Sequence, residues 1–198
     1  MKALLHLPCP ATYADYLAAE QNSERRHEFI DGVIVAMAGG SDEHNAIGFR
    51  LSALFGSRMP PECRGYSADQ RFWIEATGRG RYGDGSIIYG KPEHPAHDPQ
   101  ATTNPVVVVE VLSPTTQGDD EGEKRRDFQS LPSLQAYVMV TQDARCVKVY
   151  RRTDRGWRDE PDVYRGGERF ELPRLTRAFA VDEIYDNILD AGGRSLLR

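Results

Sequence analysis

The stretch VVVVEVLSP at 106–114 decides the fold. Its apolar run has no polar alternation, which is typical of a central strand covered on both faces. Glu110 interrupts the run, and Ser113-Pro114 ends it. Because burying an unpaired carboxylate is costly, a strand of this kind carries one for a purpose, and binding a metal ion is such a purpose.

The residues before this strand predict two helices separated by a hairpin. Thr12 is a favourable N-cap for a helix over 13–22. The segment 28–37 reads as a hairpin, because Asp31-Gly32 lies between two apolar runs and favours a tight turn. Ser41 caps a second helix, whose apolar residues recur at helical spacing.

The other elements alternate between strands and helices. Strands are predicted over 66–74, 86–89, 136–141 and 147–151, a Gly- and Arg-rich connection over 77–83, a surface loop over 91–104, a helix over 122–131, a last hairpin around Gly166-Gly167 and a C-terminal helix over 181–189. This order predicts an α/β fold of the α+β kind, with a mixed central sheet flanked by helices.

Composition limits the class of protein. A chain of 198 residues with 39% hydrophobic content predicts a single domain over 1–198, with its core at about 12–189. Three cysteines without a C-x-x-C pair support neither a disulfide framework nor a thiolate zinc site. Neither a membrane span nor a signal peptide is evident, so we expect a cytoplasmic protein.

Charge leaves nucleic-acid binding open. The net charge is −5, whereas a dedicated nucleic-acid binder usually has a basic excess. Phosphate binding needs only a basic face, and basic residues do gather in the central region: Arg71, Arg79, Arg81, Lys91, Lys124, Arg125 and Arg126.

Asp84 gives Glu110 a partner. It precedes the predicted strand over 86–89 and lies 110 − 84 = 26 residues before Glu110, so neighbouring strands could bring the two carboxylates together. Two hard oxygen ligands on adjacent strands suit Mg²⁺ or Mn²⁺. Such an ion activates water and stabilises the leaving oxygen in phosphodiester cleavage.

Five motifs occur in an order and spacing that resemble the Uma-two family of restriction-endonuclease-like proteins. They are Glu28-Phe29-Ile30-Asp31-Gly32, Ser41-x-x-His44, Arg81-x-x-Asp84, Glu110-Val111-Leu112-Ser113-Pro114-Thr115 and Asp120-x-x-x-Lys124. The resemblance spans roughly Tyr13 to Ile184. It implies the PD-(D/E)XK nuclease fold, a mixed central sheet with helices on both sides, and a site built from an Asp, a second acidic residue and a Lys.

The resemblance also implies roles for individual residues. Asp84 would be the first metal-binding carboxylate and Glu110 the second, with Glu28 as the early acid and Lys124 as the catalytic lysine. The chain departs from the superfamily pattern at two positions: Leu112 stands where a lysine would share the strand face of Glu110, and Gly83 stands where the family commonly has proline. Lys124, 14 residues after Glu110 (124 − 110), would replace that lysine from the next helix.

Structural explanations compete with these roles. Glu110 could form a structural ion pair with Arg71 or Lys124, and Asp84 between two glycines could be a turn residue. Lys124 lies in a charged run that usually marks a solvated helix face, and Asp120 one turn earlier could pair with it.

Structural explanations also compete with the proposed roles of Glu28 and His44. Glu28 could be a solvated acid beside Arg25 and Arg26. His44 could contact phosphate or support Glu28, although a histidine at a helix start most often makes only local hydrogen bonds. We therefore regard His44 and Asp120 as candidates for support of the site.

Two functions remain open. The first is a Mg²⁺- or Mn²⁺-dependent nuclease that hydrolyses phosphodiester bonds, with DNA as the substrate by resemblance and endonucleolytic action expected. The second is a non-catalytic nuclease-like module for binding or assembly, associated with mobile elements or acting as a homodimer. The acidic net charge and Leu112 favour the second function, and many restriction-type enzymes are dimers.

Overall fold

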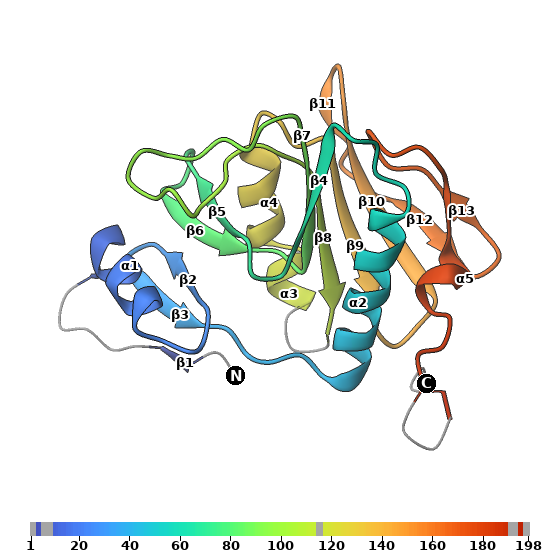
Figure 1. Ribbon diagram of the computed structural model, residues 1–198, viewed down its shortest axis with the longest axis horizontal. Helices are drawn as coiled ribbons and strands as arrows, with labels where there is room; N and C mark the ends of the chain where they lie inside the picture. The colour runs from blue at the N-terminus through green and yellow to red at the C-terminus, as the bar shows by residue number, and fades with distance from the viewer. Residues whose placement is uncertain (1–2, 5–9, 114–116, 190–193, 196–198) are drawn as a thin grey trace.

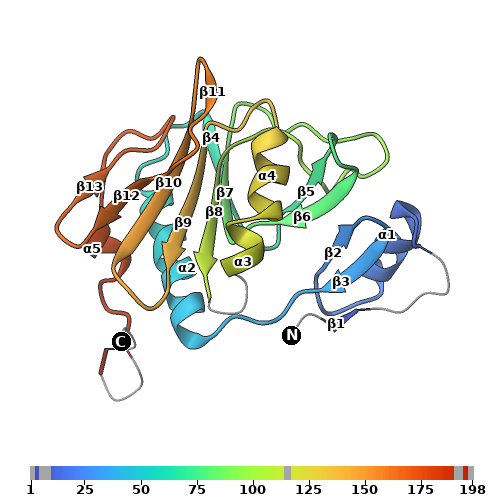
Figure 2. The same cartoon turned by 180° about the vertical axis from the view of Figure 1, so that it is seen from behind.

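The computed structural model describes residues 3–4, 10–113, 117–189 and 194–195 (Figures 1 and 2). Its helices are α1 (Tyr13–Gln21), α2 (Asp42–Gly56), α3 (Gln117–Asp120), α4 (Glu123–Ser130) and α5 (Val181–Ile184). Its strands are β1 (Ala3–Leu4), β2 (His27–Ile30), β3 (Val33–Ala36), β4 (Cys63–Ser67), β5 (Arg71–Ile74), β6 (Arg79–Tyr82), β7 (Gly85–Tyr89), β8 (Pro105–Leu112), β9 (Ala136–Thr141), β10 (Cys146–Thr153), β11 (Gly156–Trp157), β12 (Asp162–Arg165), β13 (Arg169–Phe170) and β14 (Phe179–Ala180).

A seven-stranded mixed sheet forms the centre of the molecule. Its strand order is β11-β10-β9-β8-β7-β4, with β12 paired to β10. The central strand β8 runs parallel to β9 and antiparallel to β7, and all eight of its residues are buried. The apolar run that decided the fold is therefore the middle of the sheet, as predicted.

Side chains of β8 alternate between two cores. Val107, Val109 and Val111 pack in the larger core with residues of α2 and α5. Val108 and Leu112 pack in the second core with Phe128 of α4. Figures 1 and 2 show α2 on one face of the sheet and α4 on the other. Since Glu110 alternates with Val109 and Val111, it lies on the α4 face, together with Leu112.

A five-stranded sheet stands beside this core. Its order is β1-β3-β2-β6-β5, and β2 meets β6 through the single pair Phe29 and Gly80. A separate apolar cluster fills the space between α1 and this sheet: Ala11, Tyr16, Phe29 and Ile34. The segment 37–41 leads from β3 to α2 and passes close to the ends of the central strands (Figure 1).

Local signals placed several elements correctly. Thr12 accepts a hydrogen bond from the Asp15 N–H in a capping box, and Ser41 caps α2 by accepting one from the His44 N–H. Asp31 and Gly32 both have positive φ between β2 and β3. The left-handed region suits glycine and tolerates aspartate, which is why this dipeptide forms the predicted hairpin turn.

Other boundaries were wrong. The predicted strand over 66–74 is two strands, β4 and β5, in different sheets, and the predicted connection over 77–83 contains β6. A turn does form at 166–167, but β12 pairs with β10 and β13 with β14, so it is not a hairpin. The last helix, α5, ends at Ile184 instead of about 189.

No helix in the described parts of the chain is both long and apolar enough to cross a membrane.

Candidate active site

Pairing of β7 with β8 brings the two predicted metal ligands together. Gly85 pairs with Val109, so the next step of this antiparallel register sets Asp84 opposite Glu110. The Asp84 Oδ2 atom accepts a 2.7 Å hydrogen bond from the backbone N–H of Val111. Asp84 therefore lies at the start of one strand and against the end of its neighbour, as the sequence predicted.

Glu110 is a buried carboxylate with one satisfied oxygen. Its side chain is 2% exposed, and Oε2 accepts a 3.0 Å hydrogen bond from the Lys124 Nζ. Its Oε1 atom has no hydrogen-bond partner within the described chain. A Cβ built on Gly83 would lie 3.4 Å from Oε1, so this oxygen points to the segment that carries Asp84. Burial raises the pKa of Glu110 well above its ordinary value, with Lys124 opposing.

Lys124 reaches the site from α4. Its Nζ lies 3.0 Å from Glu110 Oε2, 3.4 Å from Asp120 Oδ1 and 3.9 Å from Glu28 Oε1. Burial by itself lowers the pKa of Lys124, but the negative charges around it, Glu110 foremost, raise that pKa well above its ordinary value. The amine is therefore a protonated hydrogen-bond donor among carboxylates.

Packing of α4 explains how a helix supplies the lysine. Phe128, one turn after Lys124, is fully buried and belongs to the same core as Leu112. Residues four apart lie on the same helix face, so the packing of Phe128 turns Lys124 toward β8. Leu112 occupies the strand position at which the superfamily pattern has a lysine, and Lys124 reaches Glu110 from helix α4 instead. The charged run around Lys124 is not a solvated face at this position.

His44 and Asp120 lie at opposite sides of the pair. The His44 Nε2 atom, near the start of α2, is 3.1 Å from Asp84 Oδ2. Burial lowers the pKa of His44, but the hydrogen bond and charge of Asp84 leave it raised overall; in return, His44 lowers the pKa of Asp84 despite its burial. The backbone carbonyl of Asp120 accepts a 3.1 Å hydrogen bond from the Tyr137 hydroxyl. Both residues contact the site.

Glu28 comes from the five-stranded sheet. It is buried, and its Oε2 lies 3.2 Å from Arg81 Nη1, while its Oε1 accepts a 3.4 Å hydrogen bond from the Tyr82 N–H. Glu28 is therefore not a solvated acid beside Arg25 and Arg26. It contributes to the carboxylate group around Lys124 from a separate sheet.

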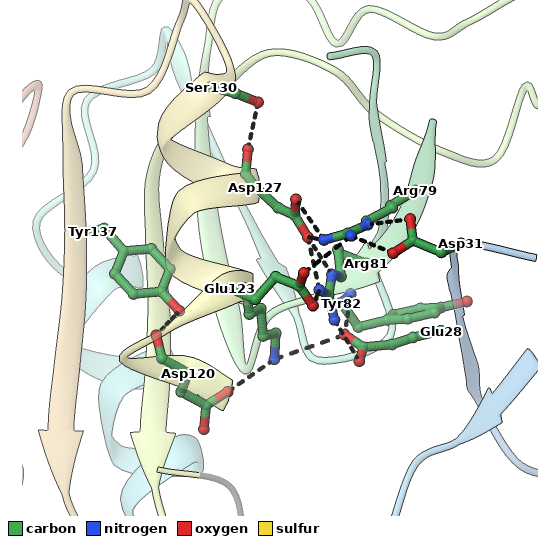
Figure 3. Close-up of polar contacts among 11 residues, drawn as sticks. Glu28, Asp31, Arg79, Arg81, Tyr82, Asp120, Glu123, Asp127, Ser130 and Tyr137 are labelled. Carbon is green, nitrogen blue, oxygen red and sulfur yellow. Dashed lines mark hydrogen bonds and ion pairs between the residues drawn. The ribbon is translucent and has the colours of Figure 1, made fainter. Parts of the chain in front are cut away.

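The structure adds an ion-pair network that the sequence did not predict (Figure 3). Arg81 is fully buried; its Nε and Nη2 lie 2.8 and 2.7 Å from Asp127 Oδ2. Arg79 also pairs with Asp127, at 3.2 Å, and with Asp31 on the β2–β3 turn at 2.5 Å. Two arginines of β6 thus connect helix α4 to the sheet that carries Glu28.

Sequence distance hid this network. Arg81 lies 46 residues before Asp127 and 53 after Glu28. The signals were the motif Arg81-x-x-Asp84, which entered through the family resemblance, and the positive charge of Arg79 and Arg81, and neither of them indicated a partner. Asp127 gave no signal beyond its place in a charged run.

The donor set fits a hard divalent cation. Within the described residues, no three His, Cys, Asp or Glu side chains form a ready-made metal cage. Mg²⁺ does not require one, since it usually keeps several waters and binds through one or two carboxylates. The partnerless Oε1 of Glu110 and the adjacent Asp84 are oxygen ligands of this kind. The residues present therefore fit Mg²⁺ or Mn²⁺ better than a closed zinc site.

The comparisons with known proteins identify a family for this chain. Residues 13–183 match the model of the Uma2 family, described as "Putative restriction endonuclease". The chain belongs to the Uma2 family. This restriction-endonuclease-like family generally uses a divalent metal, and its class of activity indicates a nucleic-acid substrate.

Two relatives and one solved structure extend the match. "Uncharacterized protein slr1290" of Synechocystis sp. is 35% identical, covering 86% of this chain and 89% of its own. "Uncharacterized protein sll1609" of the same organism is 34% identical, covering 74% and 84%. A crystal structure of "a putative nuclease belonging to DUF820" from Anabaena variabilis superposes with a TM-score of 0.68 at 16% identity, covering 82% of this chain and 90% of that one. At this identity the last match shows the fold, which confirms the predicted fold class.

Proposed function

We propose that this protein is a metal-dependent nuclease that cleaves DNA, with Asp84 and Glu110 as the ligands of Mg²⁺ or Mn²⁺. The observation that carries the proposal is the buried Glu110, which holds Lys124 at one oxygen and leaves the other without a partner beside Asp84. A structural ion pair would not require a second unsatisfied oxygen at this depth, because an unpaired buried polar atom is costly.

Each protein group would have a defined task. Asp84 is held by the Val111 N–H and by His44, so its carboxylate has one orientation toward the ligand. The chemistry that a divalent cation supplies here is polarisation of a phosphoryl oxygen and activation of a bound water. Lys124, fixed by Glu110 and Asp120, would donate a hydrogen bond that orients the attacking water.

Glu28 completes the acidic pocket. Its Oε1 lies 3.9 Å from Lys124 Nζ, and Arg81 holds its other oxygen. The carboxylates around the lysine keep it protonated, so in this proposal it acts as a donor and a positive charge near the phosphate and not as the general base.

Replacement of the ligands tests the proposal. Asp84→Ala and Glu110→Gln should each abolish Mg²⁺-dependent cleavage of a DNA plasmid. Their circular dichroism spectra should match that of the wild type, and their unfolding transitions should remain cooperative. Lys124→Met should lower the rate by about 10²–10³-fold, as expected for loss of one positioned donor. Asp154→Ala is the matched control, because Asp154 lies in the exposed turn before β11. Wild-type protein that cuts neither DNA nor RNA with Mg²⁺ or Mn²⁺ would contradict the proposal.

One observation favours the second function. The ammonium of Lys124 already neutralises Glu110, so the site is stable as an ion pair in a non-catalytic binding module. Calorimetric titration with Mn²⁺ separates the two, since such a module has no reason to retain a divalent site. Metal binding lost in Glu110→Gln supports the nuclease; absence of binding by the wild type supports the module. A homodimer remains a prediction for either function, checked by sedimentation.

A further inference from the structure

A pocket opens beside the carboxylate site. Its volume is about 640 Å³, within the range of about 300–1,000 Å³ that ligand pockets occupy. Three segments form its walls: Arg25 and Arg26 before β2, residues 36–39 at the end of β3 and after it, and residues 68–69 after β4.

Two of these walls continue directly into the site. Ser67, the residue before the 68–69 wall, pairs with Gly85, which follows Asp84. Gly40, the residue after the 36–39 wall, lies against His44: a Cβ on Gly40 would be 2.6 Å from His44 Nδ1. Because His44 Nε2 in turn contacts Asp84, the pocket lies on the Asp84 side of the carboxylates.

The arginines of this pocket differ from four of the seven basic residues of the central region. Arg71, Arg79, Arg81 and Lys124 are buried and held by carboxylates, so they cannot form a basic face for phosphate. Arg25 and Arg26 are exposed. Within the described residues, no carboxylate lies at ion-pair distance from Arg25.

The rest of the pocket has the chemistry of a nucleotide site. Arg26 Nε lies 3.2 Å from Asp69 Oδ1, an ion pair that orients its planar guanidinium at the pocket wall. Nucleic-acid bases stack on such planes, and Arg25 offers a free charge for phosphate. The remaining wall is small and apolar, with Ala36, Met37, Ala38 and Ala68, which leaves room for a sugar or base.

We propose that this pocket binds the nucleotide next to the cleaved phosphate, with Arg25 on its phosphate and the sugar or base against Arg26, Met37 and Ala68. The inference deepens the proposed nuclease function and rests on it for the identity of the ligand. It assigns substrate binding to the residues just before β2 and to two segments that join the two sheets, and it leaves catalysis to the carboxylates and Lys124.

Binding measured without cleavage tests the pocket. Fluorescence anisotropy of a short labelled DNA strand, and of its duplex, is recorded in EDTA with the full-length protein. Arg25→Glu should weaken binding of the preferred form by roughly tenfold, and Arg25→Gln should reduce the slope of log affinity against log salt by about one. Ala68→Trp should weaken binding by filling the pocket with no change of charge. Both positions are exposed, so the variants should fold.

Arg155→Glu is the matched control, since Arg155 is exposed in the turn between β10 and β11. This turn lies at the other end of the central sheet from the segment between β3 and α2 (Figure 1). Its affinity should stay within about twofold of the wild type, because only the general field changes. Three results would overturn the proposal that this pocket binds a nucleotide: equal losses of DNA affinity in Arg25→Glu and Arg155→Glu, an unchanged DNA affinity in Arg25→Glu, or a wild type that binds neither DNA form. DNA binding that depends on Arg25, in a protein that never cleaves DNA, would support the nucleotide pocket and contradict the nuclease function. Cleavage at the wild-type rate in Arg25→Glu would support the nuclease function and contradict the pocket.

Discussion

The two sheets contact the candidate site in opposite ways. The central sheet flanks Glu110 with the apolar side chains of Val108 and Leu112, which share a core with Phe128 of α4. The five-stranded sheet adds Phe72 and Ile74 of β5 to this core, but it also meets helix α4 through the charges of Arg79 and Arg81 on β6. Apolar packing is non-directional, whereas an arginine fork fixes its partner in distance and angle. The apolar core therefore holds α4 against both sheets, and the charged junction of β6 with α4 fixes the position at which the helix carries its lysine.

The largest expected effect is at this junction. Arg81→Met removes a fully buried cation and leaves Asp127 and Glu28 with fewer partners at that depth. Breaking one side of a buried ion pair costs about 3–5 kcal/mol, and we expect that loss in the free energy of unfolding measured by urea titration. Arg155→Met, an exposed arginine, should change it by less than about 0.5 kcal/mol.

A second substitution sharpens this result. Adding Asp127→Leu to Arg81→Met removes a carboxylate that has lost one of its two arginine partners, and it should restore part of the lost stability, since apolar replacement of both members of a buried ion pair is often neutral. Cleavage per folded molecule should stay low in the double variant, because the pair between Arg81 and Asp127 then no longer fixes the position of α4. Full recovery of both stability and activity would show that the junction does not position Lys124.

The same contrast explains which parts of the fold could be predicted. The hairpin at Asp31-Gly32, the cap at Ser41 and the run over 106–112 depend on neighbouring residues or on strand period, so the sequence contains their signals. Strand β6 was missed because its residues read as RGRY, which resembles a charged loop. These arginines are strand residues only because carboxylates far along the chain satisfy them.

The site divides similarly. Asp84 and Glu110 could be paired from the sequence, since both flank predicted neighbouring strands. The contact of Lys124 with Glu110 depended on the family resemblance, because the apolar packing of Phe128 and Leu112 that turns the lysine inward has no signature near Lys124. The pocket arginines Arg25 and Arg26 had no signal except their own charge.

A smaller effect with a pH signature is expected at Asp98, which joins Arg71 of β5 to Tyr13 of α1. Both its oxygens pair with Arg71, at 2.7 and 2.9 Å, and Oδ2 also accepts the Tyr13 hydroxyl at 2.7 Å. Asp98→Asn should destabilise the protein by about 1.5–3 kcal/mol near neutral pH, the range for hydrogen bonds to charged groups. Urea unfolding measures this loss.

Acid should remove the difference. Burial raises the pKa of Asp98, but the hydrogen bonds from Arg71 and Tyr13 lower that pKa by more than burial raises it. The folded-state pKa therefore lies below the ordinary value of about 3.9. A group with a lowered folded-state pKa stabilises the protein above its unfolded-state pKa and loses that contribution as pH falls through the folded value. The gap between wild type and Asp98→Asn should therefore narrow below about pH 4. A constant gap down to unfolding would mean that Asp98 contributes by shape and not by charge.

The smallest expected effect is at Gly83, which lies between β6 and β7 and packs against the central strand β8. A Cβ at this position would lie 2.9 Å from Val108 Cγ1, so the space beside β8 accommodates glycine and no larger residue unless Val108 moves. Valine has a stiff χ1 and β8 is buried on both faces, so Val108 cannot move aside freely. Gly83→Ala should cost about 1–3 kcal/mol, as overpacking does, measured by urea unfolding.

Gly83→Ala combined with Val108→Ala distinguishes packing from site geometry. The smaller side chain at 108 makes room for the new Cβ, so the cost of Gly83→Ala should be smaller in the Val108→Ala background than in the wild type. The built Cβ also lies 3.4 Å from Glu110 Oε1, an ordinary contact that does not require the carboxylate to move. Mn²⁺ affinity should therefore be preserved in the double variant. If stability recovers but Mn²⁺ affinity does not, Gly83 is needed for the space between Asp84 and Glu110, and the central sheet, like the junction, also fixes the position of a catalytic group.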